Sequence, residues 1–386
     1  MRIGLVTFFT LLSAACGRSE LFEYPEVRQT PDMGASSPDA GRPHVSTGCD
    51  ALPRFVLGNA EVISTDHLGY NKICGAGVSD GEGGIALPVY QIATISSTTL
   101  FLSPAPGTLT QVDADSMIPF GQPSGFMGID MPTNWIQFKL RAVDHSGALV
   151  LDELVSSNPS ARSVDPLGGI VVAEGQYGGP PTIVEKYSAQ GQPRWSAAVD
   201  VDLQLLATDL NGSTLALSVP GEGPVGYWFG PAGEIGPTLA GPTLNLVSDW
   251  ALRVGGGFFL AIPGDGGVEW TASVSHRDTA VHPAPAWLAS RPNTRVFPIF
   301  GGAAYAIVPR AGTAPVPCEQ TVTIVDADGN VCGQMSLGSP MSTCIPGEVM
   351  VGIDGSIIQT GPRDLDDCTS GGSCTCTWRV WRGALE

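Results

Sequence analysis

Basic residues are scarce in this chain, and charge of any kind is low. Of 386 residues, 19 are Lys or Arg and 37 are Asp or Glu, which gives a formal net charge of -18. A surface of that sign repels phosphate backbones, so the composition argues against a nucleic-acid partner. Charged residues make up only 15% of the chain, whereas an average globular domain has about 25%.

The sequence is also poor in the patterns that bind cofactors. It contains no G-x-x-x-x-G-K-[ST] loop and no H-E-x-x-H pair, so nucleotide binding and zinc-protease chemistry have no support. The few histidines lack the spacing of paired metal ligands; they are His44, His67, His145, His276 and His282. We therefore predict no cofactor.

An apolar run over residues 3–12 begins the chain. It is too short to span a bilayer and is followed by small residues, which is the layout of a secretory signal. The sequence SAAC that ends at Cys16 resembles the cleavage box of bacterial lipoproteins, with Ser13 where that family usually has Leu. The resemblance implies a lipid on Cys16 and an outer-membrane location, because Gly17 is no obvious inner-membrane retention signal. Ordinary signal cleavage, which leaves Cys16 unlipidated, is the alternative.

The next segment, residues 17–48, is rich in Pro, Gly, Ser and acidic residues and has no apolar period. Such a segment buries too little surface to offset the entropy lost on ordering. We predict a flexible stalk that spans on the order of 30 Å, between a signal segment at 1–16 and a folded domain at 49–386.

Glycine and proline are abundant, with 50 and 32 residues. Both disfavour helix interiors and punctuate strands, so the composition predicts an all-β fold of short strands. Hydrophobic residues make up 43% of the chain, which is enough for a large core.

Glycine recurs at a regular spacing before apolar strands, at Gly84, Gly125, Gly169, Gly212, Gly257, Gly302 and Gly355. The intervals of 41 to 53 residues match the length of one four-stranded propeller blade. A second series marks the following turn, at Gly147, Gly191, Gly233 and Gly329. The blade between the last two is expected to turn near residues 275–278.

The spacing predicts a β-propeller of seven blades. Fewer residues than one blade follow Gly355, so a strand within 52–64 is expected to complete the last blade beside the C-terminal strand at 377–385. Such closure removes exposed sheet edges. A β-sandwich or tandem β units are the alternative.

One unit, residues 168–199, resembles bacterial propeller repeats. The residues that carry the resemblance are Gly169, Lys186, Gly191 and Trp195. Quinoprotein-type propellers use a similar Gly-x-x-x-Trp step to dock neighbouring blades, so the resemblance implies docking here. The adjacent units depart from the pattern, with Leu151 and Pro237 in the place of the Trp.

The number of cysteines is even once Cys16 is set aside. The remaining eight, in an exported chain, suit disulfides; they are Cys49, Cys74, Cys318, Cys332, Cys344, Cys368, Cys374 and Cys376. We predict that Cys49 pairs with Cys74. The other six would form disulfides that hold the closing blade together. Cys374 and Cys376 would each pair with Cys332, Cys344 or Cys368. Six cysteines allow fifteen connectivities, and these stay open.

Two short motifs bear on chemistry. Residues 77–81, GVSDG, match a nucleophile elbow around Ser79, but their glycine-rich flanks predict a loop instead of a strand and a helix. Asp326, Asp328 and Asn330 place oxygen ligands at alternate positions, as a calcium loop does. The distal Glu of such a loop is missing and Asp-Gly favours a hairpin turn, so we predict a turn, with calcium binding as the alternative.

Together these observations predict a lipoprotein of the bacterial envelope whose propeller binds or scaffolds an envelope protein. Its contact with the membrane would be through the lipid alone. Two alternatives stay open, because propellers host many functions. One is an enzyme of quinoprotein or lyase type with its site in the central channel. The other is a cation- or glycan-binding surface protein.

Overall fold

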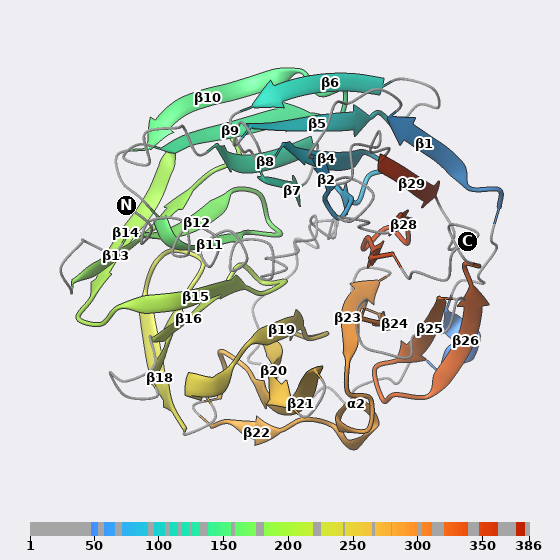
Figure 1. The fold of residues 1–386 in the computed structure, drawn as a ribbon. Coiled ribbons are helices and arrows are strands. Elements are labelled where there is room, and N and C mark those ends of the chain that lie inside the picture. The colour runs from blue at the N-terminus through green and yellow to red at the C-terminus, as the bar shows by residue number, and fades with distance from the viewer. Residues whose placement is uncertain are drawn as a thin grey trace, which may run out of the picture.

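The chain folds into seven antiparallel sheets that stand around a central axis as the blades of a propeller (Figure 1). This computed structural model describes residues 48–382 apart from 53–57, 66–71, 92–95, 105–108, 115–117, 123–124, 131–137, 156–158, 175–180, 219–224, 242–243, 265–266, 279, 300–302, 311–319, 339–346 and 362–375. The predicted all-β class and the blade count are confirmed. Among the described residues, no helix is long and apolar enough to cross a membrane.

The blades are numbered along the chain, and their strands run from the axis outward. Blade 1 has β2 (Lys72–Cys74), β3 (Val78–Ser79), β4 (Ile85–Gln91), β5 (Ser96–Leu102) and β6 (Leu109–Ala114). Blade 2 has β7 (Ile118–Gln122), β8 (Gly125–Asp130), β9 (Phe138–Asp144) and β10 (Leu149–Val155). Blade 3 has β11 (Pro159–Val164), β12 (Ile170–Glu174), β13 (Thr182–Tyr187) and β14 (Pro193–Val199). Blade 4 has β15 (Leu203–Thr208), β16 (Thr214–Ser218), β17 (Val225–Phe229) and β18 (Ile235–Ala240). Blade 5 has β19 (Asp249–Leu252), β20 (Phe258–Gly264), β21 (Gly267–Val274) and β22 (His282–Pro283). Blade 6 has β23 (Thr294–Ile299), β24 (Ala304–Pro309), β25 (Thr321–Asp326) and β26 (Val331–Ser336).

Blade 7 closes the ring with strands from both ends of the domain. It contains β27 (Val349–Val351), β28 (Ile357–Thr360), β29 (Cys376–Trp381) and β1 (Glu61–Thr65). β1 pairs antiparallel with β29, with Glu61 opposite Val380, and the two strands lie side by side on the right of Figure 1. The predicted closure is therefore confirmed.

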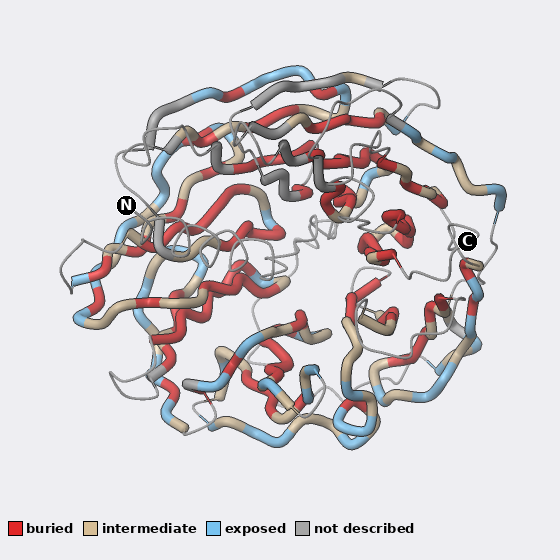
Figure 2. The backbone as a smooth tube through the Cα atoms, viewed as in Figure 1, coloured by how far each residue is buried: buried red, intermediate tan, exposed pale blue. Residues whose placement is uncertain are grey.

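Apolar side chains fill the spaces between neighbouring blades. The strands alternate, as in β13, where every second residue is buried, because successive side chains of a strand point to opposite faces. A cluster that includes Val171, Val184, Leu206 and Phe229 joins blades 3 and 4. Figure 2 shows buried backbone toward the axis and exposed backbone along the outer strands.

Blade 5 departs from the regular pattern at its outer edge. Its outer strand β22 has only two residues and is followed by the short helix α2 (Ala286–Ala289), which packs on β21. Two 3-10 turns, η1 (Cys49–Ala51) and η2 (Leu244–Leu246), complete the described elements. The predicted turn near residues 275–278 is present, with the Asp278 N–H donating to Ser275 O at 3.1 Å.

The predicted pairing of Cys49 with Cys74 is wrong. Cys49 bonds to Cys332 and Cys74 bonds to Cys376, so Cys376 and Cys332 also differ from their expected partners. The ring explains this, because closure places η1 beside β26 and β2 beside β29. Both bridges join the N-terminal part of the domain to its last two blades. The other cysteines of the predicted set, Cys318, Cys344, Cys368 and Cys374, lie outside the described residues.

Candidate functional site

Among the described residues, the tight turns on one face of the ring hold the fully buried aspartates. These turns join the first strand of a blade to the second and the third to the fourth. Asp-x-x-Gly sequences form five of them, beginning at Asp80, Asp144, Asp165, Asp209 and Asp326. In each, Asp Oδ1 accepts the backbone N–H two residues later, at 2.8–3.0 Å. We call this side of the ring the turn face.

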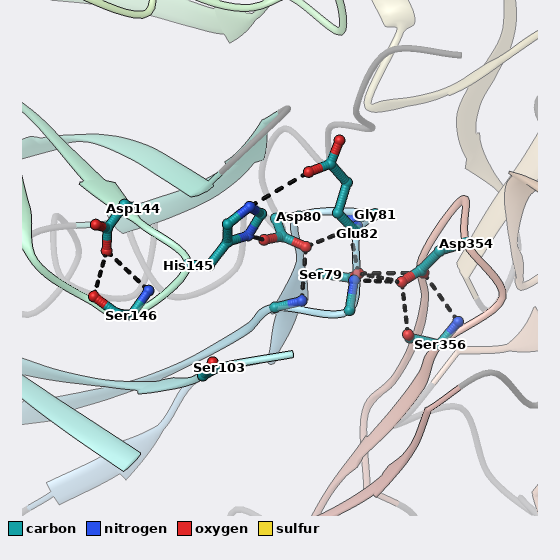
Figure 3. Close-up of polar contacts among 12 residues, drawn as sticks. Ser79, Asp80, Gly81, Glu82, Ser103, Asp144, His145, Ser146, Asp354 and Ser356 are labelled. Carbon is teal, nitrogen blue, oxygen red and sulfur yellow. Dashed lines mark hydrogen bonds and ion pairs between the residues drawn. The ribbon is translucent and has the colours of Figure 1, made fainter. Parts of the chain in front are cut away.

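The second carboxylate oxygen of several turn residues faces another element. Asp80 is fully buried, and its Oδ2 lies 2.5 Å from His145 Nδ1 in the next blade (Figure 3). The other ring nitrogen of His145 lies 3.4 Å from Glu82 Oε2. His145 therefore links blade 2 to the first turn of blade 1.

A second Asp–His pair occupies the equivalent place three blades further round the ring. Asp209 is also fully buried, and its Oδ2 accepts the Gly257 N–H at 2.9 Å and lies 3.3 Å from His276 Nδ1. His145 and His276 each follow the first residue of the turn between the third and fourth strands of their blades. Each pair thus joins the inner turn of one blade to an outer turn of the next, and we call both pairs the Asp–His latches.

Ser79 is part of the same contact system and does not form a nucleophile elbow. It ends β3 and leads into a turn and then the strand β4, without the helix that an elbow needs. Its hydroxyl donates to Asp354 Oδ1 at 3.2 Å and accepts the Gly81 N–H at 3.0 Å. Figure 3 shows Ser79 directed toward Asp354. Asp354 Oδ2 also accepts the Gly83 N–H at 3.2 Å, which ties blade 7 to blade 1.

The remaining predicted site residues have structural partners. Asp326 Oδ1 accepts the N–H groups of Asp328 and Asn330, and Asn330 Nδ2 donates to Asp326 Oδ2 at 2.8 Å, so the predicted turn is present. Calcium binding there stays the alternative, which these contacts do not test. Asp326 also lies close to Cys49 and Cys332, but their sulfurs are joined in the disulfide.

Lys186 pairs with buried Asp165 inside blade 3. His282 pairs with the exposed Asp278, at 2.5 Å. His44, His67 and Cys16 lie outside the described residues.

The docking step implied by Gly191 and Trp195 is present between several blades. A Cβ on Gly233 would lie 2.6 Å from Trp195 Cγ, and a Cβ on Gly191 would lie 2.7 Å from Leu151 Cδ2. Each large side chain of one blade therefore packs on the turn glycine of the next. Between blades 5 and 6, Trp287 of α2 packs on Gly329 in the same way, so the helix replaces the missing part of the outer strand.

Burial shifts the pKa of the Asp80 carboxyl. Loss of water around the carboxyl raises its pKa above the ordinary value of 3.8, although hydrogen bonds from Glu82 N–H, His145 and Gly84 N–H oppose the rise. A pKa that is raised in the folded state contributes stability that is fully present below about pH 3.8 and is lost as the pH rises through the folded-state pKa.

We expect Asp80→Asn to gain stability relative to the wild type as pH rises. The amide keeps an acceptor for the Glu82 and Gly84 N–H groups and carries no charge to bury. Urea unfolding between about pH 3.5 and about pH 5 measures the difference in the free energy of unfolding. The exposed Asp328→Asn is the control, and its free energy of unfolding relative to the wild type should not rise with pH in this way. A relative stability of Asp80→Asn that falls with rising pH would show that the charge pair with His145 dominates.

Comparisons with known proteins support the fold alone. No protein-family model matches the chain, and no curated protein matches it. Among solved structures, the β-propeller domain of the Trilobed protease from Pyrococcus furiosus is 6% identical with a TM-score of 0.52, covering 83% of this chain and 97% of that one.

Virginiamycin B lyase from Staphylococcus aureus is 9% identical with a TM-score of 0.48, covering 84% and 99% of the two chains. BamB from Moraxella catarrhalis is 11% identical with a TM-score of 0.41, covering 85% and 100%. Both of these scores lie below 0.5, too low to inform on function.

The sequence contained a signal for these turns beyond the glycines. Asp recurs three residues before Gly83, Gly147, Gly168, Gly212 and Gly329, and a short acid before a turn glycine favours this local hydrogen bonding. The two Asp–His latches had no such signal, because Asp80 and His145 are 65 residues apart.

Proposed function

We propose that the protein is an envelope-anchored lipoprotein whose propeller is a binding or scaffolding module for another envelope protein. The lipoprotein box at Cys16 and the polar stalk at 17–48 support the anchor. The propeller fold and the disulfides suit a stable domain in an oxidising compartment.

One observation carries the binding role. Three described residues of types that perform catalysis, Ser79, His145 and His276, are instead engaged in contacts between blades on the turn face. Ser79 bonds to Asp354, His145 to Asp80 and His276 to Asp209. These contacts fix the blades relative to one another, which gives the ring the rigidity of a recognition platform.

The anchor is tested by Cys16→Ala, which we expect to abolish labelling by radioactive palmitate and to move the protein from the membrane fraction to the soluble fraction. A stalk without its acyl chains has no strong affinity for a bilayer. Ser13→Leu, which restores the usual residue of the box, is the control and should be labelled at least as well as the wild type. Unchanged membrane association of Cys16→Ala would contradict the anchor.

The binding role is tested by crosslinking a tagged copy of the full chain in cells, followed by affinity capture and mass spectrometry. We expect one envelope protein at near-equal abundance with the bait. A capture with no protein above the background of an untagged strain would refute the scaffold role.

A further inference from the structure

The two disulfides that the structure describes differ in their access to water. Cys74 and Cys376 are 9% and 1% exposed and belong to the large core cluster. Cys49 and Cys332 are only half-buried, and they join η1 to the outer strand of blade 6. A thiol breaks a disulfide by attacking one of its sulfurs, so the reaction depends on access. The Cys49–Cys332 bridge is therefore the one that a dithiol can reduce while the domain stays folded.

A buried carboxylate lies beside this accessible bridge. An oxygen of Asp326 and the two sulfurs lie within 4.8 Å of one another. Asp326 is 2% exposed, and its Oδ1 accepts the N–H groups of Asp328 and Asn330 at 3.0 and 2.8 Å. A backbone oxygen is close as well, since Asn330 O lies 3.4 Å from Cys332 Sγ. The bridge is thus bordered by oxygen donors on a turn that hydrogen bonds hold in place.

Reduction of the bridge leaves its two sulfurs near Asp326. A dithiol gives two electrons and two protons to the S–S bond, which breaks into two thiols, and the dithiol closes into its own disulfide. Cys49 keeps its place because η1 contacts β26 and the nearby Leu52 packs against the large core. The buried Cys74–Cys376 bridge still joins the N-terminal part of the domain to blade 7.

Two cysteine sulfurs and a carboxylate form the ligand set of a thiophilic divalent cation. Zn²⁺ binds Cys sulfur at about 2.3 Å and carboxylate oxygen at about 2.0–2.2 Å, in a tetrahedron, whereas Ca²⁺ and Mg²⁺ prefer oxygen ligands alone. We propose that reduction of the Cys49–Cys332 bridge opens a site for Zn²⁺ or a cation of its class, held by both sulfurs and Asp326 with water as the fourth ligand. Binding releases the two thiol protons, and the net charge of -18 attracts cations.

This site makes the link between η1 and blade 6 depend on redox state. The disulfide forms the link in the oxidised protein, and the cation forms it between the same two cysteines in the reduced protein. The site differs from the calcium loop considered for this sequence, which would also use the side chain of Asp328. That side chain is exposed and does not belong to the group of three ligands. The inference is independent of the proposed binding function.

The test uses the purified full chain, reduced with dithiothreitol and then separated from the reagent by gel filtration without oxygen. Co²⁺ is the probe, because its bonds to thiolates produce a charge-transfer absorption, and Zn²⁺ is then added in competition. We expect one Co²⁺ per reduced chain, displaced by Zn²⁺, and no such absorption from the oxidised chain. Alkylation before metal is added, followed by peptide mass spectrometry, should find Cys49 and Cys332 modified and Cys74 still joined to Cys376.

Substitutions assign the ligands. Cys332→Ser removes one sulfur and keeps every other cysteine, so the absorption should be lost. Asp326→Asn keeps an oxygen that accepts the turn N–H groups. It should lower the affinity for Zn²⁺ about tenfold or more, since even a residue that supports a ligand contributes about 10–100-fold. Asp328→Asn is the matched control and should leave the affinity unchanged.

Four results would overturn the proposal. One is a reduced wild type without the absorption, and another is its persistence in Cys332→Ser, which would place the ion on other cysteines. An equal loss of affinity from Asp326→Asn and Asp328→Asn would place the ion in the turn. Loss of cooperative thermal unfolding on reduction is the fourth, because the site needs blade 6 to be folded. Asp326→Asn keeps both cysteines, so it tests the site even where Cys332→Ser does not fold.

Discussion

Chain termination after Thr375 is expected to abolish folding. The truncation deletes β29, which lies between β28 and β1 in blade 7. Cys376, Trp378 and Val380 are at most 1% exposed, and burial of each large apolar side chain contributes about 1.5–3 kcal/mol. Loss of the Cys74–Cys376 bridge costs about 2–5 kcal/mol more. The sum is comparable with the whole stability of an ordinary domain, about 5–15 kcal/mol.

The measurement is thermal unfolding followed by circular dichroism, with the wild type and a chain terminated after Arg382 for comparison. The chain that ends at Arg382 keeps β29 and the bonds of Arg382 to the backbone oxygens of Gly83 and Ser103, so it should unfold cooperatively. The chain that ends at Thr375 should show no cooperative transition. A stable, cooperatively folded product without β29 would mean that the other blades form an open array.

Substitution of Gly233 by Ala is expected to destabilise the protein by about 2–5 kcal/mol. Gly233 has a φ of +89°, where a side chain costs about 1–2 kcal/mol. The added methyl group would also lie 2.6 Å from Trp195 Cγ, and overpacking of this kind adds about 1–3 kcal/mol.

Gly255→Ala is the matched control for this substitution. Gly255 has a φ of +85°, but no atom lies within 4 Å of the position of its Cβ. It should therefore lose only the backbone contribution, about 1–2 kcal/mol, in urea unfolding. In a Trp195→Ala background, the cost of Gly233→Ala should fall to the same level. An equal cost of the two alanine substitutions in the wild type would show that the Trp195 contact adds nothing.

Much of the ring could be predicted from the sequence because its blades are local in the chain. The spacing of Gly169, Gly212 and Gly257 reports one turn per blade, and these glycines lie in or directly after the first turns of blades 3, 4 and 5. The shortage of residues after Gly355 indicated that a strand from the N-terminal side had to complete the last blade.

Contacts between blades were harder to predict, because the residues concerned are distant in sequence and their pairing depends on the closed ring. Cys49 and Cys332 are separated by 283 residues, and nothing near either one identifies its partner. The packing of a large side chain on the turn glycine of the next blade was hard to recognise in the sequence for a different reason. Leu151 fills the place of a Trp, and Trp287 reaches Gly329 from a helix outside the repeat pattern.

The order of the strands in blade 7 has a consequence for the timing of folding. β1 precedes the other six blades, and its partner β29 follows them, so the Cys74–Cys376 bridge spans 302 residues. A chain that emerges from its N-terminus onward cannot complete this sheet until the residues of β29 have emerged as well. On the export route proposed above, that delay would keep the domain open while the chain crosses the membrane. Closure would then take place on the far side of the membrane, where the thiols of both bridges can be oxidised.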